Sequence, residues 1–104
     1  MDDLEPKTHV YFMPGMAANP SIFEYINLPE KYVIHWLKWK IPYHNESMYS
    51  YITRMLEDVV HTDPVLIGVS FGGVIVQEMA KLISVKRLIL VSTVKSKHEL
   101  PARM

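Results

Sequence analysis

The sequence predicts an α/β domain in which helices cover both faces of a parallel sheet, a three-layer α/β/α arrangement. Strand-like and helix-like segments alternate along the chain, and such alternation favours parallel strands joined by helical crossovers. Segment 65–69 is apolar without interruption and segment 87–93 has the apolar centre LILV, as expected of strands buried on both faces. Hydrophobic residues make up 49% of the chain and charged residues 21%, so we expect a globular protein.

The first half of the chain is predicted to contain two strands separated by a short helix. Segment 9–13, HVYFM, is rich in aromatic and β-branched residues and is stopped by the Pro-Gly pair at 14–15. Asn19 or Ser21 can cap the short helix that follows. Segment 31–39, KYVIHWLKW, again has the composition of a strand.

The second half is predicted to contain two helices and the two apolar strands. Apolar residues recur at helical spacing within 45–60, and Asn45 can cap that helix. The spacing is helical again from 72 to 83, between the apolar strands. The regular elements therefore alternate as β-α-β-α-β-α-β, and a single domain accounts for all of them.

The order of the strands decides where a ligand can bind. If the strands, numbered as they appear in the chain, take the order 2-1-3-4, the chain reverses direction between the first and third strands. Open parallel sheets bind ligands at such a switch point, beyond the carboxyl ends of the strands. All four glycines of the chain lie in the loops after these two strands, one at Gly15 and three within 68–73. We therefore predict one site that both loops form.

The loop after the third strand reads GVSFGG, a G-x-S-x-G sequence on Gly68, Ser70 and Gly72. In a nucleophile elbow the serine occupies a sharp, strained turn between a strand and a helix. The residues two before and two after the serine crowd each other there, so both must be small. Gly73 would let the helix lie close to the sheet. Because a strand precedes the motif and a helix follows it, we predict Ser70 as a nucleophile.

Over about 8–97 the chain resembles the α/β-hydrolase family, with GVSFGG as the elbow and FMPGMAA as the oxyanion loop. The resemblance implies that the four strands are the family's third to sixth, in the order 2-1-3-4. It implies that Ser70 attacks the substrate while the backbone N–H groups of Met16 and Phe71 hold the oxyanion. It also implies an acid after the sixth or seventh strand and a histidine after the eighth, which would lie beyond residue 104.

These observations lead us to expect one partial domain over 1–104. Its expected function is the hydrolysis of a small-molecule carboxylic ester or thioester through an acyl-enzyme on Ser70, without a cofactor. The alternative is a non-catalytic ligand-binding or interaction protein on the same fold. His98 and Glu99 follow the last strand at the correct end of the sheet, but a solvated loop explains them better.

Composition excludes several other classes of function. Eleven basic residues balance eleven acidic ones, so neither nucleic acid nor an anionic membrane is an expected partner. The chain has no cysteine, no histidine pair at metal-ligand spacing and no carboxylate cluster, so we expect no metal. The acidic amino terminus is unlike a signal peptide, and we expect a cytoplasmic protein. The last strand is too apolar for a bare sheet edge, so further strands or a partner subunit are expected to cover it.

Overall fold

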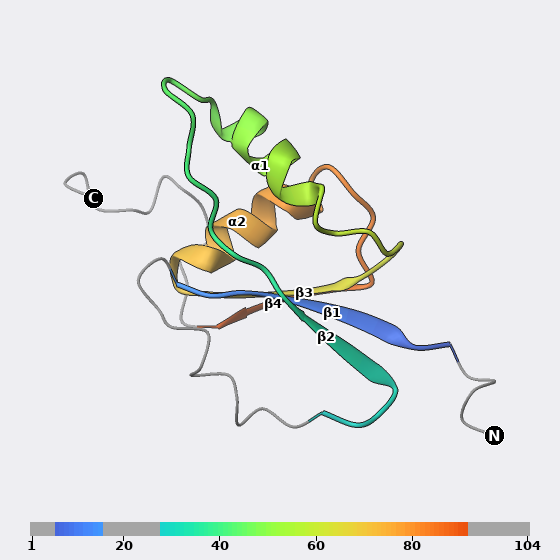
Figure 1. Cartoon of the computed structure of the whole chain (residues 1–104). Helices are drawn as coiled ribbons and strands as arrows, with labels where there is room; N and C mark the ends of the chain where they lie inside the picture. Colours follow the sequence, from blue (N-terminus) through green and yellow to red (C-terminus); the bar gives the residue numbers. More distant parts are fainter. Residues whose placement is uncertain (1–5, 16–27, 92–104) are drawn as a thin grey trace.

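The computed structural model describes residues 6–15 and 28–91. Its elements in chain order are β1 (Thr8–Met13), β2 (Tyr32–Trp36), α1 (Met48–Leu56), β3 (Val65–Val69), α2 (Phe71–Ala80) and β4 (Arg87–Val91). The four strands form one sheet in the order β2-β1-β3-β4, and every neighbouring pair is parallel (Figure 1). The predicted parallel sheet and its strand order are therefore confirmed.

β1 lies in the middle of the sheet and fixes where the two glycine loops meet. It pairs with β2 from Thr8 opposite Tyr32, and with β3 from Val10 opposite Val65. At the carboxyl end of this second pairing, Met13 stands opposite Gly68. Because the strands are parallel, the loops that follow β1 and β3 leave the sheet at the same edge.

Both described helices cover the same face of the sheet (Figure 1). The main core lies between them and the sheet, and its buried residues are Tyr11, Met13, Leu37, Tyr51, Ile52, Met55, Leu66, Ile75, Val76 and Met79. Val10, Phe12 and Val65 form a smaller cluster on the opposite face. The described residues thus make two layers. The short helix predicted near Asn19 and Ser21, which would add to a third layer, lies outside them.

The start of α1 differs from the prediction by two residues. Ser47, not Asn45, is the cap: its backbone is extended and its side chain accepts the N–H of Ser50 at 3.0 Å. Asn45 has a φ of 57°, a left-handed conformation that asparagine tolerates better than most residues, and it makes the turn before the helix. Neither of the described helices has the length and apolarity needed to cross a membrane.

β4 forms an edge of the described sheet, and its apolar side chains are exposed. Leu88 and Ile89 are each 37% exposed, Leu90 is 36% exposed and Val91 is 44% exposed. The prediction that this strand is buried on both faces is therefore wrong for the described part of the chain. An apolar strand at the edge of a sheet is a surface on which another strand can pair. That further strands or a partner subunit cover it stays a prediction.

Candidate active site

Ser70 occupies a strained turn between β3 and α2. Its φ is 55° and its ψ is −127°, close to the first central residue of a type II′ turn, where glycine is preferred. Such a conformation costs a non-glycine residue about 1–3 kcal/mol and persists only where its surroundings enforce it. Here the Ser70 N–H donates to the Val91 carbonyl at 3.1 Å, and the Ser70 carbonyl accepts from Gly73 at 2.9 Å. The residue itself is exposed.

Two of the predicted elbow glycines stand where a side chain would not fit. A Cβ on Gly68 would lie 2.5 Å from the Gly73 Cα and 2.5 Å from the Val76 Cγ2. A Cβ on Gly72 would overlap the carbonyl oxygens of Met13 and Pro14 at the end of β1. The predicted crowding around Ser70 is thus present, and the contact between Gly68 and Gly73 brings α2 close to the sheet, as the sequence indicated.

The loop after β1 reaches the same place. A Cβ built on Gly15 would lie 3.4 Å from the Ser70 Cβ and 3.8 Å from its Oγ, so Gly15 lies beside the candidate nucleophile. The Trp39 Nε1–H donates to the carbonyls of Pro14 at 3.1 Å and Gly15 at 3.3 Å, which fixes the start of this loop. Met16, the predicted second oxyanion donor, lies outside the described residues.

Phe71, the other predicted oxyanion donor, is the first residue of α2. Backbone N–H groups in the first turn of a helix have no partner within the helix, so they are available to a ligand. The helix dipole also favours negative charge at this end. Phe71 therefore has the position that the elbow requires, directly after the strained serine.

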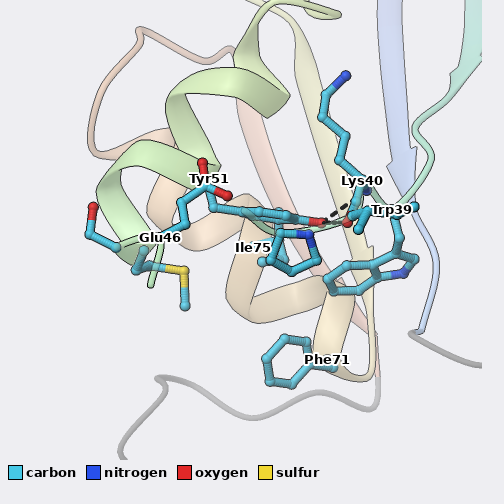
Figure 2. A pocket seen from close by; sticks show the side chains of 10 residues that line it. Trp39, Lys40, Glu46, Tyr51, Phe71 and Ile75 are labelled. Carbon is cyan, nitrogen blue, oxygen red and sulfur yellow. Dashed lines mark hydrogen bonds between the residues drawn. The ribbon is translucent and has the colours of Figure 1, made fainter. Parts of the chain in front are cut away.

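A largely apolar pocket of about 560 Å³ opens next to Phe71 (Figure 2). Its lining residues are Trp39, Lys40, Ile41, Pro42, Glu46, Ser47, Met48, Tyr51, Phe71 and Ile75. The Trp39 and Phe71 rings are tilted against each other with centroids 5.6 Å apart. Phe71 was predicted from the sequence as an oxyanion donor, but the other lining residues were not predicted, because the segment before α1 has no periodic pattern. Met13, two residues before Gly15, is fully buried in the core and does not line this pocket.

Glu46 holds the rim of this pocket through four hydrogen bonds. Its carboxylate accepts from Arg54 Nε at 2.8 Å and Arg54 Nη2 at 2.6 Å, from the Ser50 hydroxyl at 2.9 Å and from the Tyr43 N–H at 3.0 Å. The hydrogen bonds from Arg54 are the main reason that the pKa of Glu46 falls to about 2. The bonded Arg54 in turn lies over the Tyr43 ring, 3.8 Å from its centroid.

Replacing Glu46 with glutamine is expected to make the free energy of unfolding depend less on pH in the acid range. Because the folded pKa of about 2 is below the ordinary 4.5, Glu46 stabilises the fold above pH 4.5 and loses this effect as the pH falls toward 2. The wild type should therefore be more stable than Glu46→Gln at neutral pH, with the difference shrinking across that acid range. Urea denaturation at a series of pH values measures this. Glu57→Gln, an exposed carboxyl at the end of α1, is the control, and a difference that does not depend on pH would contradict the prediction.

Three histidines that sequence reasoning did not connect meet elsewhere on the sheet. His9 of β1 and His35 of β2 are hydrogen bonded, with Nδ1 and Nε2 2.8 Å apart. The His61 ring, from the loop before β3, stacks on His9 with centroids 3.3 Å apart. The pKa of His35 is lowered mainly by burial and further by the nearby His9 and His61. The pKa of His9 is likewise lowered by burial and then by His61. Spacing along the chain gave no sign of this cluster, because only the strand pairing brings the three segments together.

Comparisons with known proteins identify no family. A scan of the chain against models of protein families gave no match, and a search of curated proteins found no similar sequence. The strand order, the strained serine and the glycine contacts are therefore the basis on which a function can be argued.

Proposed function

We propose that this chain carries the nucleophile half of a serine hydrolase of carboxylic esters or thioesters. Ser70 attacks the carbonyl carbon of the substrate, and the alcohol or thiol leaves as the acyl-enzyme forms. Water then attacks the acyl-enzyme and releases the carboxylic acid and the free Ser70 hydroxyl. The N–H groups of Phe71 and Met16 are the proposed donors to the oxyanion, and each such donor is worth about 10²–10³ in rate.

The observation that carries this proposal is the backbone of Ser70. A serine held at φ 55° and ψ −127° at the start of a helix is unfavourable by itself, and glycine at this position would relieve the strain. The turn projects the serine at the carboxyl edge of the sheet, beside Gly15. Strain at such a place is typical of a nucleophile elbow and has no evident structural benefit.

The apolar pocket supports an acyl substrate. Phe71 connects the elbow to the pocket, since it follows Ser70 and lines the pocket wall. Aromatic and aliphatic walls with few polar groups suit the hydrocarbon part of an acyl group. The same pocket is what the alternative, a ligand-binding protein without catalysis, would use.

The general base and the acid are proposed to lie outside the described residues. A base must come within hydrogen-bond reach of the serine hydroxyl. His9 and His61 belong to the amino ends of β1 and β3, whereas Ser70 follows the carboxyl end of β3. In the family that the sequence resembles, the histidine comes after a later strand, which here would lie beyond residue 104.

Labelling with a fluorophosphonate probe tests the proposal. The probe reacts with an activated serine, so we expect labelling that Ser70→Ala abolishes and that Ser84→Ala, an exposed serine after α2, leaves unchanged. Both the 104-residue chain and any longer natural form should be tested, because the proposed base and acid lie past residue 104. Labelling of the longer form alone would place the base there, and labelling of the short chain would make His98 the next residue to replace.

Failure to label any folded form would overturn the hydrolase proposal. If small apolar ligands still bound to the pocket under those conditions, the ligand-binding alternative would take its place. Labelling that survives in Ser70→Ala would mean that another serine reacts, and that result would also overturn the role proposed for Ser70.

A further inference from the structure

The three histidines on the helix-covered face form a cluster that the hydrolase proposal does not use. One ring nitrogen each from His9, His35 and His61 lies within 4.8 Å of those of the other two. We propose that these three imidazoles bind a divalent transition-metal ion, Zn²⁺, at a site separate from the candidate active site. The proposal rests on the arrangement of the histidines and is independent of the role of Ser70.

The spacing of the nitrogens fits one metal ion once the rings have rotated toward a common centre. Zn²⁺ binds imidazole nitrogen at about 2.0–2.1 Å, so two ligands in tetrahedral geometry lie roughly 3.3–3.4 Å apart. The present separations, from 2.8 Å between His9 and His35 up to 4.8 Å within the set, bracket that value. Imidazole is a favoured ligand of zinc, and three histidines with a water in the fourth position make a known type of zinc site.

Tyr11 supplies the outer hydrogen bond that metal-binding histidines usually have. Its hydroxyl lies 2.7 Å from His61 Nδ1 and also accepts the Val60 N–H at 3.3 Å. If Nδ1–H of His61 donates to this hydroxyl, Nε2 keeps its lone pair for the metal. Tyr11 is 1% exposed, so its hydroxyl is held in place by the surrounding core.

Metal binding requires the His61 ring to turn. The His9 and His61 rings are now stacked with an angle of 7° between their planes, so their in-plane lone pairs point into different planes. One ion can bind both nitrogens only when the rings leave this stack. His61 belongs to the loop between α1 and β3, and its side chain can therefore rotate without disturbing the pairing of the strands.

The surroundings of the cluster are accessible but carry no net attraction for a cation. A pocket of about 590 Å³ reaches His9 from solvent, and Asp63 lines it together with Lys7, Lys31 and Lys86. The three lysines oppose the approach of a cation, whereas the one carboxylate favours it. The affinity must therefore come from coordination by the imidazoles, which favours Zn²⁺ over Mg²⁺ or Ca²⁺, ions that prefer oxygen ligands.

Calorimetric titration of the tag-free chain with Zn²⁺ tests this site. We expect one equivalent to bind, while Mg²⁺ does not. His61→Asn, in a loop where the fold should survive, is expected to weaken binding by about 100-fold or more, because it removes a direct ligand. Tyr11→Phe should weaken it by about 10-fold, as is usual for an outer hydrogen bond. His44→Asn, an exposed histidine before α1, is the matched control and should bind as the wild type does.

Substitution of Co²⁺ gives a second readout, because its visible d–d bands report tetrahedral coordination. Absence of Zn²⁺ binding to the folded chain would overturn the proposal, as would wild-type affinity in both His61→Asn and His35→Asn. Loss of binding in His44→Asn would also overturn it. Ser70→Ala should bind Zn²⁺ unchanged, so this test and the labelling test can fail separately.

Discussion

Gly72→Ala is expected to destabilise the protein by about 3 kcal/mol or more. In a free helix this substitution would stabilise by about 1 kcal/mol, because alanine is the better helix former. Here the added methyl group would overlap the carbonyl oxygens of Met13 and Pro14, which are backbone atoms that no side-chain rotation can move. Either α2 must withdraw from β1 or the end of β1 must shift, so the steric cost outweighs the gain in helix propensity.

Chemical denaturation of Gly72→Ala measures this effect, and Gly15→Ala is the matched control. The nearest described atom to a Cβ on Gly15 is 3.4 Å away, an ordinary contact, so its free energy of unfolding should change by less than about 1 kcal/mol. The new methyl would nevertheless lie 3.8 Å from the Ser70 Oγ and should slow labelling of that serine. A Gly72→Ala protein as stable as the wild type would show that α2 does not approach β1 this closely.

Tyr51→Ala is expected to cost about 3–5 kcal/mol, the range for removing a large buried aromatic side chain. Tyr51 is 8% exposed and belongs to the main core. Its hydroxyl also donates to the Lys40 carbonyl at 2.8 Å and accepts the Lys40 N–H at 3.0 Å (Figure 2). The side chain thus joins α1 to the segment that forms one wall of the pocket, and its loss should open that wall as well as the core.

Tyr51→Phe separates the contribution of the buried ring from that of the hydroxyl group. It keeps the ring in the core and removes both hydrogen bonds to Lys40, so we expect a loss of about 1–2 kcal/mol in the free energy of unfolding. Denaturation of both variants under the same conditions gives the difference. If Tyr51→Ala were no less stable than Tyr51→Phe, the ring would contribute nothing to the core, and the packing described for α1 would be wrong.

The parallel sheet and the turn at Ser70 could be predicted from sequence because their signals are local. The segment 65–69 is apolar without interruption and ends at Ser70 and its glycines, and β3 has those bounds. The strand order was assumed as one that the connection rules allow, and it agreed with the order that the family resemblance implies. The cap of α1 was missed because Asn45 and Ser47 are both good caps, and nothing local chooses between them. Glu46 directly precedes Ser47 and accepts hydrogen bonds from Arg54 and Ser50 of α1. These contacts form only when the segment before α1 folds back on the helix, so they could not be read from the sequence.

The pocket and the histidine cluster could not be predicted, since both depend on contacts between distant segments. His9 and His35 are 26 residues apart in the chain, as are His35 and His61, and only the pairing of Tyr11 with His35 brings the first two together. The pocket wall comes from 39–48, a stretch with no hydrophobic period, fixed by bonds to α1. A side chain's partners across a parallel sheet follow from the register of the strands, and nothing in the sequence indicated that register.

The central place of β1 has a consequence for synthesis of the protein. Ribosomes make β1 first, yet the strand that pairs with its second edge comes 55 residues later, as the pairing of Val10 with Val65 requires. At a synthesis rate of about 5–20 residues per second, this edge of β1 stays unpaired for roughly 3–11 seconds until β3 has been made. During this interval the nascent chain exposes the apolar segment VYFM, which is then a target for chaperones and for aggregation. Conditions that slow elongation between residues 13 and 65 should therefore lower the yield of folded protein.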